Sequence, residues 1–213
     1  MIEFSYLCFL LFTLTFLVLL VRKNSELSPK KIKMFLNIVL APLIVRYIAL
    51  IISFIVEEQR IVYFLKYLYN LNYLSIPLIV LVIVYIFLRD EKIKFNYLYI
   101  ILVAFVTLYL IIIKTYKHNI LIDIKFGFTI TLENSSLVTL MYLVIMASIL
   151  VFSLINLDKP FSNKIGMRCI LGTIALYLVE FILGLSGLYI YPISIIGEII
   201  IYLNLLKSIN TFK

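Results

Sequence analysis

The stretch FLKYLYNLNYLSIPLIVLVIVYIFLRD, residues 64–90, decides the fold class, because a run rich in tyrosine and asparagine leads without a break into an apolar segment. An apolar run of roughly 20 residues is long enough for one helix to cross the hydrocarbon core of a bilayer. Of the 213 residues, 64% are hydrophobic and only 14% are charged. Such a chain has too little polar surface to cover a soluble globule. The sequence therefore predicts an integral membrane protein.

Seven segments of this kind occur along the chain, and we expect each to form one membrane-spanning helix. They lie at about 4–21, 34–56, 67–88, 95–113, 136–156, 169–189 and 191–207. Between the last two, Gly187 can adopt a positive φ and Pro192 suits the first turn of a new helix, which favours a tight reversal. Six helices, with the final pair fused, is the alternative. No linker or repeat divides the chain, so residues 1–213 are expected to form a single all-α, seven-helix membrane domain.

Lysine and arginine are distributed unevenly between the two sides of this predicted bundle. The loops between helices 1 and 2, 3 and 4, and 5 and 6, together with the C-terminus, hold thirteen, whereas the loops of the other side hold five. Positively charged residues near helix ends stay on the cytoplasmic side. The distribution predicts a protein of the bacterial plasma membrane with its N-terminus outside and its C-terminus inside. The net charge of +8 is then explained by topology and contact with anionic lipid, and no nucleic acid partner is expected.

The longest loop, residues 114–135, carries the alternating pattern ILIDIKFGFTITLE at 120–133. A period of two indicates extended chain, and Gly127 in its middle permits either one bent strand or a hairpin. We expect a small extracellular β-hairpin or strand over the outer mouth of the bundle. It could rest passively on lipid and helix ends, or it could cover a ligand.

Three ionisable side chains fall well inside predicted spans, namely Arg46, Glu180 and Glu198. Counting about 1.5 Å per residue places all three at a similar depth, roughly 10–15 Å below the outer boundary. A charge in hydrocarbon needs a partner, a proton or water. We expect both glutamates to converge on Arg46, since a guanidinium can bind two carboxylates from different directions, and Tyr202 lies on the Glu198 face at i+4. The group could be a structural clamp or a switch coupled to a ligand or a proton, and separate placements are the third possibility.

Polar residues also gather where the third span begins. Asn70, Tyr73 and Pro77 recur at helical spacing, so they define one face of the expected helix, and Asn72 lies beside them. We expect this face to look into the bundle and to form, with the outer loop, an outward-open pocket; an ordinary aromatic belt at the membrane interface is the alternative. The candidate ligand-binding or coupling residues are Arg46, Asn70, Asn72, Tyr73, Glu180, Glu198 and Tyr202.

The sixth predicted helix carries Gly172, Glu180 and Gly184 at multiples of four residues. Small residues at this spacing let another helix backbone approach closely. The pattern predicts close packing of the last two helices through these glycines.

Catalytic chemistry finds no support in the sequence. One histidine and two distant cysteines do not make a metal site, and no phosphate-binding loop or dinucleotide glycine motif occurs. We therefore expect neither an enzyme nor a bound cofactor.

Three stretches, taken in order, resemble the N-terminal seven-transmembrane sensory region of bacterial histidine kinases. KYLYNLNYLSIPLIVLVIVYIF (66–87) resembles its third helix, KFGFTITLENSSLVTLMYLVIMASILVF (125–152) its outer hairpin and fifth helix, and GMRCILGTIALYLVEFILGLSGLYIYPISIIGEIIIYLNLLKS (166–208) its last two helices. The resemblance implies a receptor-like module that binds a small ligand or peptide from the outside and passes a helix movement inward. Because no phosphoacceptor-histidine helix or ATP-binding domain follows Lys207, a separate cytoplasmic or membrane signalling partner is expected.

Two other functions remain open from the sequence. A small-solute transporter, or the substrate-binding subunit of a transporter, would use the same polar layer as its solute site. A structural or immunity-type membrane protein would use that layer only to set helix packing.

Overall fold

Eight α-helices, one hairpin and a final 3₁₀ turn follow one another along the part of the chain that the structure describes. The computed structural model describes residues 2–56, 58–90, 92–123, 126–133, 135–188, 191 and 193–213. The elements are α1 (Ile2–Leu27), α2 (Lys30–Ile55), α3 (Gln59–Tyr69), α4 (Asn72–Leu88), α5 (Asn96–Thr115), β1 (His118–Asp123), β2 (Gly127–Leu132), α6 (Ser135–Ile155), α7 (Lys164–Leu185), α8 (Ile195–Ile209) and η1 (Asn210–Phe212). The predicted combination of a helical bundle with a small β element is confirmed.

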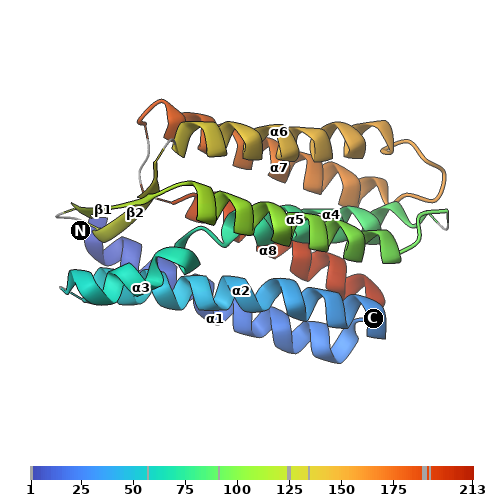
Figure 1. Cartoon of the computed structure of the whole chain (residues 1–213). Helices are drawn as coiled ribbons and strands as arrows, with labels where there is room; N and C mark the ends of the chain where they lie inside the picture. Colours follow the sequence, from blue (N-terminus) through green and yellow to red (C-terminus); the bar gives the residue numbers. More distant parts are fainter. Residues whose placement is uncertain are drawn as a thin grey trace.

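Seven helical segments of these described residues are long and apolar enough to cross a membrane, with α3 and α4 together forming the third. α7 ends at Leu185 and α8 begins at Ile195, so the alternative count of six helices is wrong. Gly187 adopts the positive φ expected of it, at 79°, whereas Pro192 lies outside the described residues. The N-terminus and the hairpin lie at one end of the bundle, here called the hairpin end, and the C-terminus lies at the opposite end (Figure 1).

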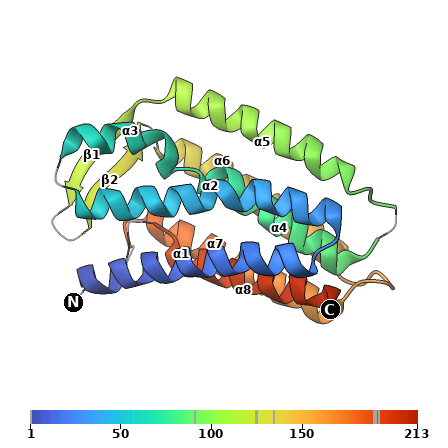
Figure 2. The same ribbon diagram turned by 90° about the horizontal axis from the view of Figure 1, so that it is seen from below.

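α4 occupies the middle of the bundle, where it packs against α2, α5, α6, α7 and α8. Figure 2 shows it lying behind α2 and among the later helices. Side chains on every side of α4 are buried, including Ile76, Ile79, Val80 and Ile83. A helix that is apolar all round is stable only when it is covered all round. The apolar half of the 64–90 stretch is therefore the centre of the core.

The third span is interrupted, contrary to the prediction of one continuous helix over 67–88. α3 begins earlier, at Gln59, and the helix breaks at Asn70 and Leu71 before α4 continues. After the break, the Tyr73 N–H donates to the carbonyl of Asn70 instead of that of Tyr69. Asparagine disfavours helix interiors because its side chain competes for backbone hydrogen bonds. The prediction that Asn70 and Tyr73 share one continuous helical face is therefore wrong, and the polar run marks the helix break, defined as Asn70 and Leu71.

The 114–135 loop forms a hairpin, not one bent strand. β1 and β2 pair antiparallel, from His118 opposite Leu132 to Asp123 opposite Gly127. The apolar residues of β2 are buried. In β1, Ile120 is partly buried against the core, whereas Ile122 is 73% exposed, so the alternating pattern is only partly covered in β1. Gly127 has φ 71°, and a Cβ there would lie 2.9 Å from the Ser53 carbonyl oxygen. Glycine thus lets β2 lie directly on the last turn of α2.

Candidate functional site

A buried ion pair joins α2 to the first turn of α8. Arg46 is 1% exposed and Glu198 is fully buried. The Arg46 Nη1 atom donates to both carboxylate oxygens of Glu198, at 2.9 Å to Oε1 and 2.7 Å to Oε2. The hydroxyl groups of Tyr47 and Tyr202 also donate to Oε2, at 2.6 Å and 3.2 Å. The carboxylate is therefore surrounded by donors, as a buried charge requires.

The same arginine also binds the helix break. Its Nε atom donates to the Tyr69 carbonyl oxygen at 2.9 Å. This oxygen is available because the Tyr73 N–H, its partner in a continuous helix, bonds to Asn70 instead. A buried carbonyl without a donor costs about 1–3 kcal/mol. Arg46 thus ties the end of α3 to α8 through one rigid guanidinium group.

Glu180 does not join this pair, which corrects the prediction that both glutamates converge on Arg46. Its Oε2 atom instead accepts a hydrogen bond of 2.7 Å from the Gly197 N–H. The first turn of α8 exposes unpaired N–H groups, and its N-cap residue, Ser194, makes no capping bond with its side chain. A carboxylate is favourable beside such N–H groups and the positive end of the helix dipole. Glu180 therefore holds the start of α8 against α7.

The glycines that allow α7 and α8 to approach are not those predicted. A Cβ at Gly172 or Gly184 would meet no atom within 4 Å, so the predicted strip does not mediate the contact. A Cβ at Gly197 would lie 2.5 Å from the Tyr177 ring and 2.6 Å from Glu180 Oε2. Gly197 of α8 is the residue that permits the close approach. Its position next to Glu198, in a stretch otherwise rich in isoleucine, was the available sequence signal.

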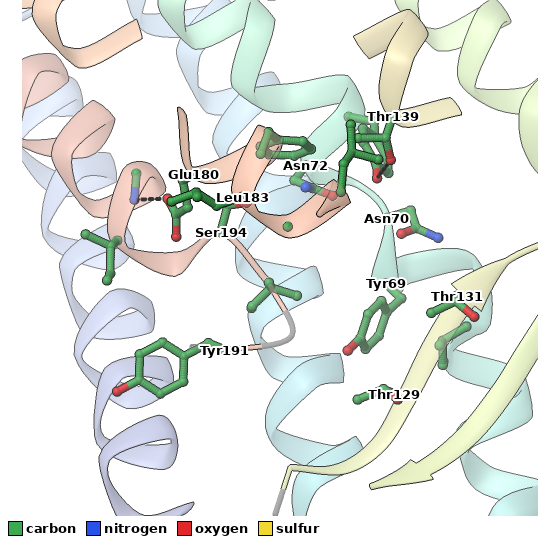
Figure 3. Close-up of a pocket in the computed structure, with 18 of the residues that line it drawn as sticks. Tyr69, Asn70, Asn72, Thr129, Thr131, Thr139, Glu180, Leu183, Tyr191 and Ser194 are labelled. Atoms are coloured by element: carbon green, nitrogen blue, oxygen red, sulfur yellow. Dashed lines mark hydrogen bonds between the residues drawn. The ribbon is translucent and has the colours of Figure 1, made fainter. Parts of the chain in front are cut away.

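A cavity of about 810 Å³ opens at the hairpin end, beside the Arg46 pair. Its walls come from the helix break, the hairpin, α7 and the start of α8 (Figure 3). Of the predicted site residues, Arg46, Asn70, Asn72, Tyr73 and Glu180 line it, whereas Glu198 and Tyr202 lie behind it, fully buried. Ligand pockets of small molecules typically measure about 300–1,000 Å³. The cavity is therefore large enough for a small ligand or a short peptide segment.

The two asparagines bring unpaired amide groups to this cavity. Asn72 is only 7% exposed, and no hydrogen bond of its side chain is found among the described residues. The Asn70 Nδ2 atom is buried and likewise has no partner within the described part of the chain. Figure 3 shows both side chains at the cavity, between Glu180 and the hairpin. Buried polar groups are nearly always paired, so these two amides indicate a place where a ligand or water completes the pairing.

Buried tyrosines that were not predicted as site residues, Tyr142 and Tyr177, lie next to the predicted Tyr73, behind the cavity lining. Tyr73 approaches Thr139 of α6, with 3.5 Å between their hydroxyl oxygens. The Tyr142 ring lies edge-on to Tyr73 at 4.9 Å and its hydroxyl is 3.1 Å from that of Tyr177. Tyr47, adjacent to Arg46, gave a signal by position alone, but Tyr142 and Tyr177 could not be distinguished from other tyrosines of the chain.

The described lining of the cavity holds more carboxylate groups than cationic groups. Arg46 is neutralised by Glu198, and the other charged residues of the described lining are Glu180 and Asp123. Within the described ranges, no group of three histidine, cysteine, aspartate or glutamate side chains could hold a metal ion.

The sequence matches no family model, and no curated protein matches it significantly.

Proposed function

We propose that this chain is a receptor-like sensory module, which binds a small ligand or peptide from the outside and signals to a separate partner. The observation that carries the proposal is the shared position of Arg46. One guanidinium binds the Tyr69 carbonyl at the wall of the cavity and the Glu198 carboxylate of α8. A change at the Tyr69 carbonyl therefore alters the contact of Arg46 with Glu198 of α8, and α8 leads to the opposite end of the bundle.

The charge distribution supports the direction of this signal. Thirteen lysine and arginine residues belong to the loops and terminus of the opposite end, and five to the loops of the hairpin end. The positive-inside rule then assigns the hairpin end to the outside of the plasma membrane. The resemblance to the sensory region of histidine kinases points in the same direction, with the ligand outside and the partner inside.

The expected movement starts at the helix break. A ligand that pairs with Asn70 and Asn72 displaces the end of α3, and the Tyr69 carbonyl leaves Arg46. A hydrogen bond to a charged donor contributes about 1.5–3 kcal/mol, enough to change a conformational equilibrium about tenfold or more. The released guanidinium reorients on Glu198, and α8 shifts relative to α7.

Cys169 provides a built-in reporter for this shift. The thiol lies on α7 near the opposite end, 3.3 Å from the Lys207 Nζ atom of α8. In a Cys8→Ser background, its rate of alkylation measures how α8 lies against α7. Arg46→Lys keeps the positive charge but has no counterpart of the Nε donor, so it removes the hydrogen bond to the Tyr69 carbonyl. We expect the alkylation rate to change about tenfold, in line with the lost hydrogen bond.

Arg60→Lys, on the exposed start of α3, is the matched control and should leave the rate unchanged. Glu198→Gln serves as a second variant, because it weakens the tie from the α8 side while preserving the shape of the side chain. Unchanged Cys169 reactivity in folded Arg46→Lys and Glu198→Gln proteins would refute the coupling. A second experiment tests for the partner. Crosslinking in native membranes from a photoreactive residue in place of Lys207 should capture a signalling protein, whereas the same probe in place of Lys114 should not.

The interrupted third span favours one other function. Transporters often bind their solutes where a membrane helix is broken, and the helix break lines the cavity here. Uptake of a solute by purified protein in liposomes, lost in Asn72→Ala, would support transport. Capture of a permease from Lys207 would instead indicate a substrate-binding subunit.

A further inference from the structure

We infer that the cavity receives an amphipathic ligand that carries an ammonium group and a hydrogen-bonding carbonyl. This inference rests on the proposed function and deepens it by naming the chemistry of the ligand. The charge, the unpaired amides and the apolar walls of the cavity each match one part of this ligand.

The ammonium group is required by the charge of the lining. The only described cation of the lining, Arg46, is occupied by Glu198 and by the Tyr69 carbonyl. Glu180 lines the cavity without a lysine, arginine or histidine within 4.0 Å among the described residues. Its bond from Gly197 uses one of the roughly four acceptor positions that a carboxylate offers. A positively charged group therefore finds a partner at Glu180, whereas an anion meets no available cation among the described lining residues.

The carbonyl group is required by the two asparagines. Asn70 Nδ2 is a buried donor without a partner in the described part of the chain, and Asn72 is a nearly buried amide that also lacks one. An amide donates through nitrogen and accepts through oxygen. A ligand with peptide-like groups satisfies both functions. Figure 3 shows Asn72 between Glu180 on one side and Asn70 on the other, so the carbonyl lies on the helix-break side of the ammonium group.

The apolar part of the ligand is required by α7 and α8. Leu176, Val179 and Leu183 of α7 line the cavity and yet are 57%, 52% and 43% exposed. They continue the wall beyond the bundle interior to the surface where lipid chains lie. Ile196 and Ile200 of α8 face the same space. An aliphatic side chain or tail is therefore accommodated there, next to the cationic group.

Two dipeptide amides test this inference directly. Leucyl-leucinamide has a free ammonium group, and its N-acetylated form has the same side chains and backbone carbonyls without the charge. The readout is the shift in thermal unfolding of the full chain in nanodiscs as each probe is titrated. We expect the free amine to bind at least about tenfold more tightly, the difference that an ion pair in a partly buried site supplies.

The variants separate the parts of the site. Glu180→Gln retains an acceptor for the Gly197 N–H, so the protein should fold but should no longer distinguish the two probes. Asn72→Ala removes a side chain that makes no internal hydrogen bond and should weaken both probes equally. Glu3→Gln removes the same charge from an exposed position outside the cavity and should leave binding unchanged.

Equal binding of the two probes to the unmodified protein, discrimination that persists in Glu180→Gln, or no shift with either probe would overturn the inference. Each of these results is independent of the Cys169 measurement. If the inference fails and Arg46→Lys still alters Cys169 reactivity, the receptor proposal stands with another class of ligand. If discrimination is found but the Cys169 rate does not respond, the ligand class stands and the coupling fails.

Discussion

Replacing Arg46 by methionine should destabilise the protein more than most single substitutions would. Glu198 would remain fully buried. Its carboxylate now has four donor contacts, and without the two from Arg46 only those from the Tyr47 and Tyr202 hydroxyl groups would remain. Removing one partner of a buried ion pair costs about 3–5 kcal/mol. For a chain of 213 residues, each kcal/mol lowers the melting temperature by about 2–4 °C, so a fall of about 6–20 °C is expected.

A double-mutant cycle distinguishes the ion pair from simple loss of volume. Glu198→Met alone leaves Arg46 uncompensated and should cost a similar amount. The double variant Arg46→Met/Glu198→Met buries no charge, so its melting temperature should exceed that of either single variant. Its remaining deficit should come from three buried polar groups that lose their partners, namely the Tyr69 carbonyl and the hydroxyl groups of Tyr47 and Tyr202. Each such group costs about 1–3 kcal/mol.

Thermal unfolding of all four proteins in one detergent or nanodisc preparation provides the measurement. Arg60→Met, on the exposed first turn of α3, controls for replacing arginine by methionine and should shift the melting temperature by less than about 2 °C. If the two single effects simply add in the double variant, Arg46 and Glu198 are not energetically coupled, and their bond to each other does not hold α8 to α2.

Three further predictions concern the packing and the hairpin. Gly197→Ala should lower stability by about 1–3 kcal/mol, since its Cβ would overlap α7. Gly184→Ala should be neutral or stabilising by up to about 1 kcal/mol. Equal effects of the two substitutions in chemical or thermal unfolding would contradict the assignment of Gly197 as the residue that permits the contact between α7 and α8. Gly127→Val places a β-branched residue at positive φ against α2. Amide hydrogen exchange across 118–132 should therefore accelerate while the amides of α4 stay protected. Unchanged exchange rates in the hairpin would show that the close contact with α2 is not needed. Burial and the nearby Lys66 lower the pKa of His118. The stability that the neutral ring supports is therefore complete above about pH 6.5 and is lost as the pH falls toward the lower folded-state value. The protection factors of the hairpin amides, which are corrected for the intrinsic pH dependence of exchange, should fall at about pH 5.5 and should not fall in His118→Gln. A pH response of the protection factors that survives this substitution would assign it to another group.

The balance between sequence and tertiary structure is clearest at the hairpin and the third span. The period-two pattern at 120–133 predicted extended chain because alternation is a local property of a strand. The same pattern left its partner undetermined, since pairing depends on where the chain turns. In the third span, the apolar run correctly predicted a buried helix, but the sequence did not predict the interruption of this helix at Asn70 and Leu71. A short polar interval has similar hydropathy whether it begins a helix or breaks one.

Composition and apolar length by themselves determined that seven helical segments can cross a membrane, because the cost of exposing or burying a side chain depends mainly on its chemistry. They also determined that Arg46, Glu180 and Glu198 each needed a partner. Which partner each one found was decided only by the tertiary structure. Depth along a helix follows from counting residues, but direction changes by about 100° with every residue, so the rotation and crossing of whole helices decided that Glu198 meets Arg46 while Glu180 meets the first turn of α8.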